Sequence, residues 1–272
     1  MSKFLKDSLV WGISISTTVF TFVPDSIIGL VKLFGSIDDA WNLLLNKIGI
    51  LSLAIIFSSM LNKITNDKRN KRTIKGSGYT IQVEFGDLFK CENCQKVISF
   101  DECFTSQVGM APHEIKASSI CGQYLVMNPD LNIKGLIENA GLKPCKERSK
   151  FNNQIKYKSG SIVPNGDELL LAFAKLDENG RGYFSSREAY LDSLSVMWSE
   201  IHKYYQQKDV CIPILGGGLT SIGDTTPTRQ ELVDLIIESY KLHAHKIKNP
   251  QKLRIICKSR NDISLSRIGE TL

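Results

Sequence analysis

Two long apolar stretches near the N-terminus constrain the fold of this chain more than any other feature. Residues 8–23 contain no charged side chain, and residues 41–64 contain only two lysines. A helix needs about 20 mainly apolar residues to cross a bilayer. The second stretch meets this length, and the first meets it with part of residues 1–7 or by continuing past a kink at Pro24. The pattern predicts a transmembrane helical hairpin over residues 1–65.

Charges that flank the two stretches predict the orientation of the hairpin. Lys3 and Lys6 precede the first stretch, six basic residues lie between positions 63 and 75, and the turn between the stretches carries Asp38 and Asp39. Because basic flanks remain in the cytoplasm, we expect a multi-pass inner-membrane protein with its N-terminus and large domain in the cytoplasm. The alternatives are a cleaved signal peptide and two buried helices of a soluble protein.

Small and hydroxyl side chains are frequent in both stretches, and they allow helices to pack closely in lipid. Because two helices are too few to enclose a pore, we expect a homo-oligomer that assembles through the hairpin. Asp25, Lys32 and Lys47 are costly within a bilayer, so they either extend to the interface or line a leak between assembled hairpins. Residues 66–78 are basic and end in Gly-Ser-Gly, which predicts a linker against anionic lipid.

Positive charge is concentrated in the N-terminal quarter of the chain. Residues 1–75 carry ten Lys/Arg and five Asp/Glu, whereas residues 76–272 carry 24 and 23. A nucleic-acid-binding domain would show a basic footprint on its folded part. The near-neutral folded part therefore argues against nucleic acid as a partner.

The seven cysteines are an odd number at scattered positions, which is typical of a reducing cytosol rather than of a disulfide framework. Cys91, Cys94, Cys103 and His113 provide four candidate zinc ligands. Their spacing is not that of a common zinc finger, so we expect no metal. Two histidines lie two residues apart on an expected helix and are not expected to share a face: His243 and His245.

Residues 79–272 alternate between strand and helix patterns. Residues 209–216 form an apolar run typical of a strand buried on both faces, and amphipathic helices are expected over 185–207 and 228–247. The remaining strands are expected at 79–85, 96–100, 159–164, 167–176 and 252–258. This order predicts an α/β fold with a mixed, largely parallel sheet flanked by helices.

Three glycines, Gly216 to Gly218, follow the most apolar strand and precede a helix that starts with a capping box, Thr228 and Glu231. Ligands of such sheets bind beyond the carboxyl ends of strands, where glycine N–H groups can approach phosphate oxygens. The spacing is neither that of a Walker loop nor that of a dinucleotide fingerprint. Taken alone, the glycines are as typical of a mobile connection as of a phosphate cradle.

Several stretches together resemble a known family. "VEFGDLF" at 83–89 is similar to the strand-Gly-Asp start of macro domains, and "IPILGGGLTSIG" at 212–223 is similar to the macro-domain loop that wraps the diphosphate and distal ribose of ADP-ribose. Residues 100–125 stand where the second phosphate-side loop does, without matching it closely. With the hairpin, "FD" at 100–101 and "SSICGQ" at 118–123, the whole chain resembles the membrane-macro effectors of Thoeris antiphage defence.

The resemblance implies a mechanism. A partner TIR-domain enzyme would make an ADP-ribose derivative from NAD, and a histidine–ADP-ribose conjugate is expected for this branch. The macro domain would bind this ligand without a cofactor, and the assembled hairpins would then disrupt the inner membrane and cause abortive infection.

The resemblance also implies a site. Asp87 would accept from the adenine amino group, Leu88 and Phe89 would pack on its ring, and the glycine loop would donate to the diphosphate. Residues near Ser119 would meet the opposite phosphate or the distal ribose, although a serine there would also suit a helix cap and Asp87 would also suit a turn. The implied ligand-binding residues are Asp87, Leu88, Phe89, Asp101, Ser119, Ile120, Gly122, Gln123, Gly216, Gly217, Gly218, Leu219, Thr220, Ser221 and Ile222.

Catalytic macro domains that hydrolyse ADP-ribose carry an Asn-rich stretch where this chain has "SQVGMAPHE" at 106–114. The chain shows no Asn or acid in an obvious water-activating position there, so we expect sensing without turnover. Asp101, Glu102 or His113 would be the groups for a slow hydrolysis, which leaves a membrane-tethered ADP-ribosyl hydrolase as the alternative. A tethered scaffold protein with a vestigial pocket is a third hypothesis.

Overall fold

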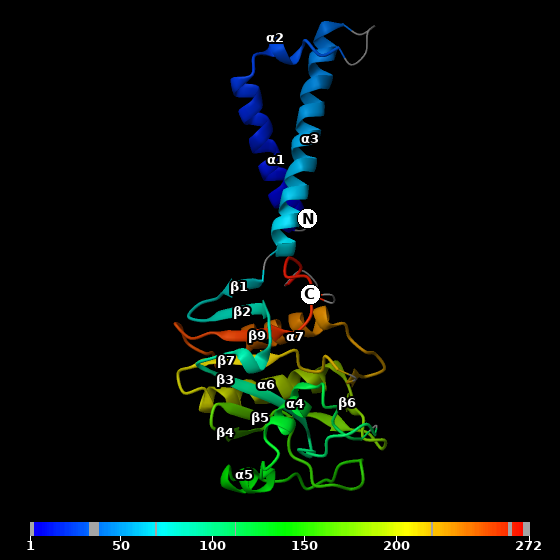
Figure 1. The fold of residues 1–272 in the computed structure, drawn as a ribbon, viewed down its shortest axis with the longest axis vertical. Coiled ribbons are helices and arrows are strands. Elements are labelled where there is room, and N and C mark those ends of the chain that lie inside the picture. The colour runs from blue at the N-terminus through cyan, green and yellow to red at the C-terminus, as the bar shows by residue number, and fades with distance from the viewer. Residues whose placement is uncertain are drawn as a thin grey trace. The chain divides into compact units, whose positions relative to one another are not determined.

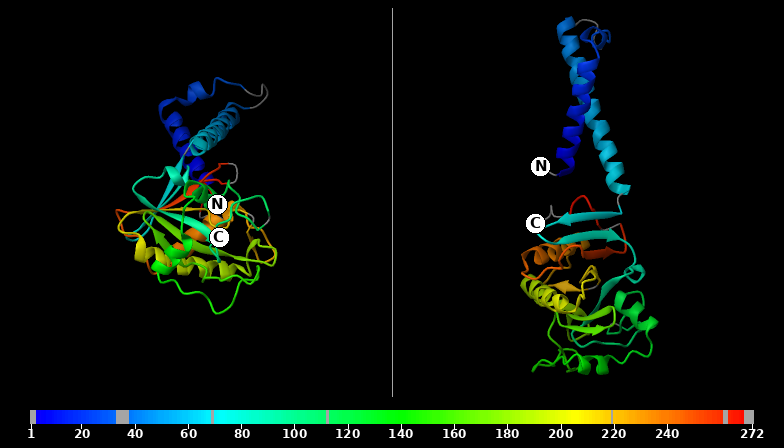
Figure 2. Two further views of the ribbon diagram at one scale, coloured as in Figure 1. Left: turned by 60° about the horizontal axis from the view of Figure 1, so that its bottom comes forward. Right: turned by 90° about the vertical axis from the view of Figure 1, so that its left-hand side faces the viewer.

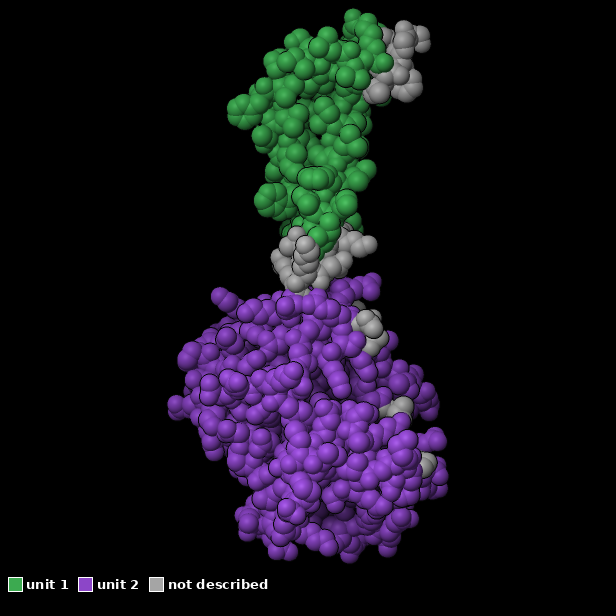
Figure 3. Space-filling model, viewed as in Figure 1, with its two compact units in different colours: residues 1–69 green, residues 70–272 purple. Residues whose placement is uncertain are grey.

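The structure is a computed structural model that describes residues 3–32, 38–68, 70–111, 113–218, 220–260 and 263–268. It contains two compact units, Met1–Arg69 and Asn70–Leu272 (Figures 1 and 3). The first unit is entirely helical in its described part, and the second carries the sheet. Each unit is therefore considered by itself.

The first unit is a helical hairpin. Helix α1 (Lys3–Phe22) and helix α3 (Asp39–Lys68) lie side by side, joined through the short helix α2 (Asp25–Ile28) (Figure 1). A Cβ atom added at Gly12 would lie 2.7 Å from the side chain of Ile55, so the two helices approach closely there. Four small residues are buried along the seam between the helices: Ser8, Ser16, Ala54 and Ser58.

Helix α3 is apolar enough to cross a membrane. Among the helices of the described residues it alone meets this measure of length and composition, over Asp39–Asn62 with a mean hydropathy of 1.8. The same measure does not support the prediction of a second span in α1, because hydroxyl residues and the charged residues Lys6 and Asp7 lower its apolarity. The hydroxyls donate to carbonyls one turn earlier at 2.8–2.9 Å, namely Ser14, Ser16, Thr17, Thr18 and Thr21.

The charged residues beside the turn of the hairpin pair with one another. Lys47 lies 2.8 Å from Asp25, and Lys32 lies 3.4 Å from Asp39. These pairs involve all three residues whose charge the sequence marks as costly. Each of these charged groups therefore has an ion-pair partner in the same chain. From the sequence we considered only side chains that extend to the interface or line a leak, and not this pairing.

The second unit contains, within the described residues, a nine-stranded sheet in the order β1-β2-β9-β7-β3-β5-β6-β8, with β4 also paired to β5 (Figure 1). Strands β2, β9, β7, β3 and β5 run parallel to one another. Strands β1, β4 and β6 pair antiparallel. The strands are β1 (Lys71–Lys75), β2 (Thr80–Phe85), β3 (Cys94–Asp101), β4 (Ile162–Asn165), β5 (Glu168–Leu176), β6 (Gly182–Phe184), β7 (Asp209–Pro213), β8 (Ser221–Ile222) and β9 (Leu253–Cys257). The predicted mixed, largely parallel sheet is confirmed.

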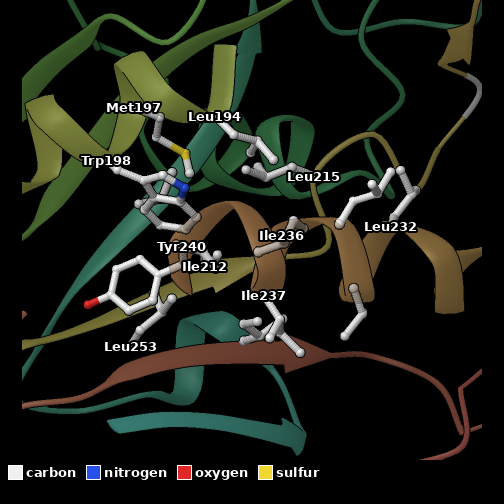
Figure 4. Packing of buried hydrophobic residues seen from close by; sticks show 14 of the residues in the cluster. Leu194, Met197, Trp198, Ile212, Leu215, Leu232, Ile236, Ile237, Tyr240 and Leu253 are labelled. Atoms are coloured by element: carbon white, nitrogen blue, oxygen red, sulfur yellow. The ribbon is translucent and has the colours of Figure 1, made fainter. Parts of the chain in front are cut away.

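Helices α6 (Arg187–Tyr204) and α7 (Arg229–Leu242) cover one face of the sheet and enclose the larger core (Figures 2 and 4). The Trp198 ring lies 4.9 Å from the Tyr240 ring, and its Nε1 donates to Ser239 Oγ at 3.1 Å. Both helices begin as the sequence predicts, because Ser186 caps α6 and a capping box formed by two side chains starts α7: Thr228 and Glu231.

Helices α4 (Ile120–Met127) and α5 (Ile133–Asn139) enclose a second core on the opposite face (Figure 2). Alternate residues of β5 divide between the two cores: Leu169 and Leu171 belong to the larger one, Leu170 to the smaller. The central strands are therefore buried on both faces, as their continuous apolar runs predict.

The predicted linker over residues 66–78 is largely structured. Helix α3 continues to Lys68, and β1 pairs with β2 from Lys71↔Glu84 to Lys75↔Thr80. The alternation around Ile74, which packs on the core, is the strand signal that the surrounding lysines conceal. Lysines on an edge strand protect its free edge from further pairing.

Three of the four histidines form a group at the end of α7. Because the chain leaves the helix at His243, the rings of His243 and His245 lie 5.5 Å apart, and His245 stacks on His202 at 4.7 Å. The prediction that His243 and His245 do not share a face is wrong, because it assumed a helix that extends to residue 247. Ser199 Oγ contacts His243 Nε2 at 3.2 Å.

Acidification should destabilise this corner of the domain. Burial lowers the pKa of His243 below its usual 6.5, and the positive charges of His245 and Lys246 lower it further. As the pH falls, His243 therefore binds a proton in the unfolded chain before it does so in the folded chain. The contribution of His243 to stability is full above about pH 6.5 and is lost as the pH falls from 6.5 through the lowered pKa of the folded state. We therefore expect Tm to be lower at pH 5.5 than at pH 7.5, and H243Q to reduce this difference in Tm.

Candidate functional site

The parallel strands bring three predicted segments to one edge of the sheet. Gly86 and Asp87 follow the carboxyl end of β2, Ile214 follows that of β7, and Asp101 ends β3. Since β2, β9, β7 and β3 are all parallel, these ends lie at the same edge. Ligands of parallel sheets bind at this edge.

Asp87 begins the short 3-10 helix η1 (Leu88–Lys90). Its Oδ1 accepts from the Phe89 N–H at 3.0 Å, so the aspartate serves the turn that the sequence allows as an alternative. The side chain is exposed, and within the described residues its Oδ2 has no partner. One carboxylate oxygen therefore remains able to accept a hydrogen bond from a ligand.

The two residues after Asp87 pack inward. Leu88 is 2 % exposed within the second core, so its side chain does not present a surface to an adenine ring. Phe89 is partly buried against the same core. The predicted contact of Leu88 with the adenine ring is not supported, because the turn after β2 directs the Leu88 side chain into the second core.

The glycine loop opens at Gly218. Gly216 has a φ of +76°, a conformation that glycine adopts without strain. The Gly217 N–H donates to Ile214 O at 3.3 Å, and a Cβ atom added at Gly217 would lie 3.2 Å from that oxygen. A Cβ atom added at Gly218 would have nothing within 4 Å. Within the described residues the N–H groups of Gly216, Gly218 and Thr220 have no partner.

The end of the glycine loop is part of the sheet. Ser221–Ile222 forms β8, which pairs with β6, and the Ile222 N–H donates to Thr225 O at 2.8 Å. The Ile222 N–H is therefore engaged within the protein, and a contact of Ile222 with a ligand would be made by its side chain. Leu219, also predicted to bind, lies outside the described residues.

A hollow of about 370 Å³ borders the loop beyond β8. Ile222 lines it together with Arg187 and the start of α7. Sequence reasoning missed this hollow, because Arg187 lies far from the loop in the chain and reaches it only through the pairing of β6 with β8.

The start of α4 is held by its own residues. Ser119 Oγ accepts from the Gly122 N–H at 3.0 Å and donates to Lys116 O at 2.7 Å, and Gln123 Nε2 donates to Ser118 O at 3.0 Å. A Cβ atom added at Gly122 would lie 2.1 Å from Lys116 O, so packing alone requires a glycine there. Ser119 is thus a helix cap, the alternative that the sequence allows, and Ile120 is partly buried beside it.

The residues considered for hydrolysis do not come together. Asp101 Oδ1 accepts from the N–H groups of Cys103 at 2.8 Å and Thr105 at 3.2 Å, and burial raises its pKa. Glu102 follows the end of β3 and is buried, and its Oε1 accepts from Ser149 Oγ at 2.7 Å. His113 stacks on a phenylalanine ring at 5.7 Å.

The candidate zinc ligands also separate. Cys91 and Cys94 lie within reach of Cys211 instead of Cys103, and within the described residues no three His, Cys, Asp or Glu side chains are placed to hold a metal ion. A hydrogen bond with Cys211 lowers the pKa of Cys94 to about 7 against the opposing effect of burial. Arg254 Nη2 lies 3.9 Å from Cys91 Sγ. This thiol group depends on the pairing of β3 with β7, which the cysteine spacing does not reveal.

Comparisons with known proteins agree with these motifs. The model of the family "Thoeris protein ThsA, Macro domain" matches residues 81–258. The Thoeris protein ThsA of Bacillus amyloliquefaciens (strain Y2) is 27% identical over 256 residues, which cover 90% of this chain and 82% of that protein.

Solved structures of similar folds include mutant macrodomains of Oceanobacillus iheyensis. One, with ADPR, is 8% identical over 72% of this chain and 95% of its own, with a TM-score of 0.43. Another is 10% identical over 73% and 95%, with a TM-score of 0.46. The family match spans most of this chain, including the Asp87 turn and the glycine loop. The chain therefore belongs to the Thoeris ThsA family of antiviral-defence proteins, and residues 81–258 are its macro domain.

Proposed function

We propose that this chain is a membrane-anchored sensor and effector of antiphage defence whose macro domain binds an ADP-ribose-derived signal. The observation that carries the proposal is the edge of the sheet. Among the described residues, Asp87 there offers a carboxylate oxygen without a partner, and the glycine loop offers unpaired N–H groups around the open space at Gly218. A carboxylate suits the adenine amino group, and N–H groups suit a diphosphate.

The signal would be held mainly by the backbone. Residues 76–272 are almost neutral in sum, and N–H groups gathered in a loop bind phosphate without a basic side chain. The proposed signal is made from NAD by a partner TIR-domain enzyme, and a histidine–ADP-ribose conjugate is the form expected. No cofactor takes part in this proposal.

The hairpin would be the effector part. α3 is long and apolar enough to span a bilayer, and α1 packs closely against it through small residues. In the proposal both helices cross the inner membrane, with the N-terminus and the macro domain in the cytoplasm. Ligand binding then assembles hairpins from several chains, and the membrane is disrupted, which ends in abortive infection.

The proposal includes no turnover of the signal. It is supported by the engagement of Asp101 with two backbone N–H groups and by the separate placement of Glu102 and His113. A base that activates water needs a lone pair directed at that water near the scissile bond. Slow hydrolysis would be detected as free ADP-ribose.

Calorimetric titration of the full chain in detergent tests the proposal. ADP-ribose and its histidine conjugate should bind saturably, adenosine should bind weakly because it lacks the diphosphate, and mass spectrometry should recover the conjugate unchanged. If neither ADP-ribose nor the conjugate binds, the sensor proposal is wrong. If the conjugate is converted during the incubation, the protein is a hydrolase.

Asp87→Asn should weaken ligand binding without unfolding η1. An amide oxygen can still accept from the Phe89 N–H, so the turn persists, whereas the charge-assisted bond to adenine is lost. Such a bond contributes roughly 1.5–3 kcal/mol, and we expect about a tenfold higher Kd by calorimetry. Asp177→Asn is the matched control, because Asp177 Oδ1 accepts from the Asn179 N–H at 2.8 Å in a similar turn of the β5–β6 hairpin. Equal affinity of D87N and D177N for ADP-ribose would exclude this role of Asp87.

A further inference from the structure

A second hollow, of about 510 Å³, lies between α6 and the segment that joins α5 to β4. This volume is in the range of pockets that hold small molecules. The hollow shares no lining residue with the Asp87 turn or the glycine loop. It is therefore a separate place on the domain, and the proposed signal does not account for it.

Two buried polar groups at the base of this hollow lack a full set of partners. Glu102 is 3% exposed, and its Oε1 accepts from Ser149 Oγ at 2.7 Å and from the Leu176 N–H at 3.3 Å. Its Oε2 has no partner within the described residues, and the buried Ser159 Oγ has none there either. A buried carboxylate with an unpartnered oxygen is costly. Glu102 lines the hollow, and its Oε2 is the atom placed to meet a ligand there.

Four lysines line the same hollow: Lys146, Lys156, Lys158 and Lys175. Lys156 lies 3.4 Å from Glu147, whereas in the described part of the chain the other three have no carboxylate within ion-pair distance. None of the four approaches Glu102 closely enough to pair with it. Glu147 and Asp192 also line the hollow, so with Glu102 it has three carboxylates against four lysines. The lysines that lack a carboxylate partner repel one another, and an anion between them relieves the repulsion.

We propose that this hollow binds a small zwitterion, whose anionic group meets the lysines and whose ammonium group meets Glu102. An anion alone would leave Glu102 Oε2 without a donor, and a cation alone would face the lysines. A molecule with both groups provides a partner for the lysines and for Glu102 Oε2. The hollow thus selects the separation of opposite charges rather than net charge.

Titration of the full chain in detergent with three probes tests this proposal. The probes are O-phosphoethanolamine, which carries both groups, and its two halves, inorganic phosphate and ethanolamine. O-phosphoethanolamine should bind with a Kd below about 1 mM. Phosphate should bind about tenfold more weakly or less, and ethanolamine should not bind.

Substitutions of residues that line the hollow test whether O-phosphoethanolamine binds there. Lys175→Gln and Glu102→Gln should each weaken binding of O-phosphoethanolamine about tenfold, since each removes a charge-assisted contact. Lys150→Gln is the matched control, because the Lys150 ammonium lies over the Tyr183 ring, 5.4 Å from its centroid, and does not line the hollow.

Three results would overturn the proposal. The first is no binding of O-phosphoethanolamine at millimolar concentration. The second is binding no tighter than that of phosphate, which would indicate a plain anion site. The third is an equal affinity of K175Q, E102Q and K150Q for the probe, which would place the probe elsewhere. Gly218→Val should leave this binding unchanged, so failure here is distinguishable from failure of the proposed ADP-ribose site.

Discussion

Valine at Gly218 is expected to abolish binding of ADP-ribose derivatives while the domain stays folded. A Cβ atom at this position meets nothing within 4 Å, so the fold tolerates the side chain. The added methyl groups would fill the space beside the N–H groups of Gly216 and Gly218, which have no partner in the described part of the chain and next to which the diphosphate is proposed to lie. Loss of two N–H bonds to a charged phosphate costs roughly 3–6 kcal/mol, or at least about 100-fold in affinity.

Thr226→Val is the control for this prediction, because Thr226 is exposed on the same connection beyond β8. Calorimetry with ADP-ribose should show normal binding for T226V and none for G218V, with Tm values of both close to that of the natural chain. Gly217→Ala is less informative, since its Cβ atom would lie 3.2 Å from Ile214 O and would distort the loop itself. Normal affinity of folded G218V would remove the glycine loop from the proposed site.

Valine at Gly12 should suppress membrane disruption. Its Cβ atom would lie 2.7 Å from Ile55 Cγ1 and 2.9 Å from Ile55 Cα, and the second contact is with backbone that has little freedom to move. The substitution therefore forces α1 and α3 apart. Overpacking of this kind costs roughly 1–3 kcal/mol, so we expect dye release from proteoliposomes in the presence of the signal to fall by about tenfold or more.

Gly49→Val separates this effect from a general effect of valine in the hairpin. Gly49 lies in α3, and a Cβ atom added there has nothing within 4 Å. G49V should release dye as the natural chain does, and both variants should bind ADP-ribose normally in detergent. Equal dye release by G12V and G49V would show that close packing of α1 on α3 is not needed for the lesion.

Local patterns in the sequence predict the frame of the macro domain. The three-to-four-residue stripes of α6 and α7, the capping box at Thr228 and the apolar run before Gly216 each depend on neighbouring residues only. Parallel strands then place the residues that follow them at one edge. The positions of Asp87 and the glycine loop could therefore be predicted before the pairing of strands was known.

Contacts between distant segments explain what the sequence did not reveal. Leu88 is buried because η1 packs over β7 and β3, and Cys211 joins Cys91 and Cys94 for the same reason. The hollow near Glu102 forms only where α6 meets the segment after α5. Such features depend on tertiary packing, and no window of the sequence contains both partners.

The strand order sets the distance between the two ends of the proposed ligand site. Strand β9 lies between β2 and β7, so the strands that carry Asp87 and the glycine loop are two strand spacings apart. Each spacing is about 4.8 Å, which sets a separation of about 10 Å across the edge. A molecule shorter than this touches one end of the site only. In the proposed function, this separation would select ligands by the length between the base and the phosphates, and a nucleoside without a diphosphate would be too short to contact both ends of the site.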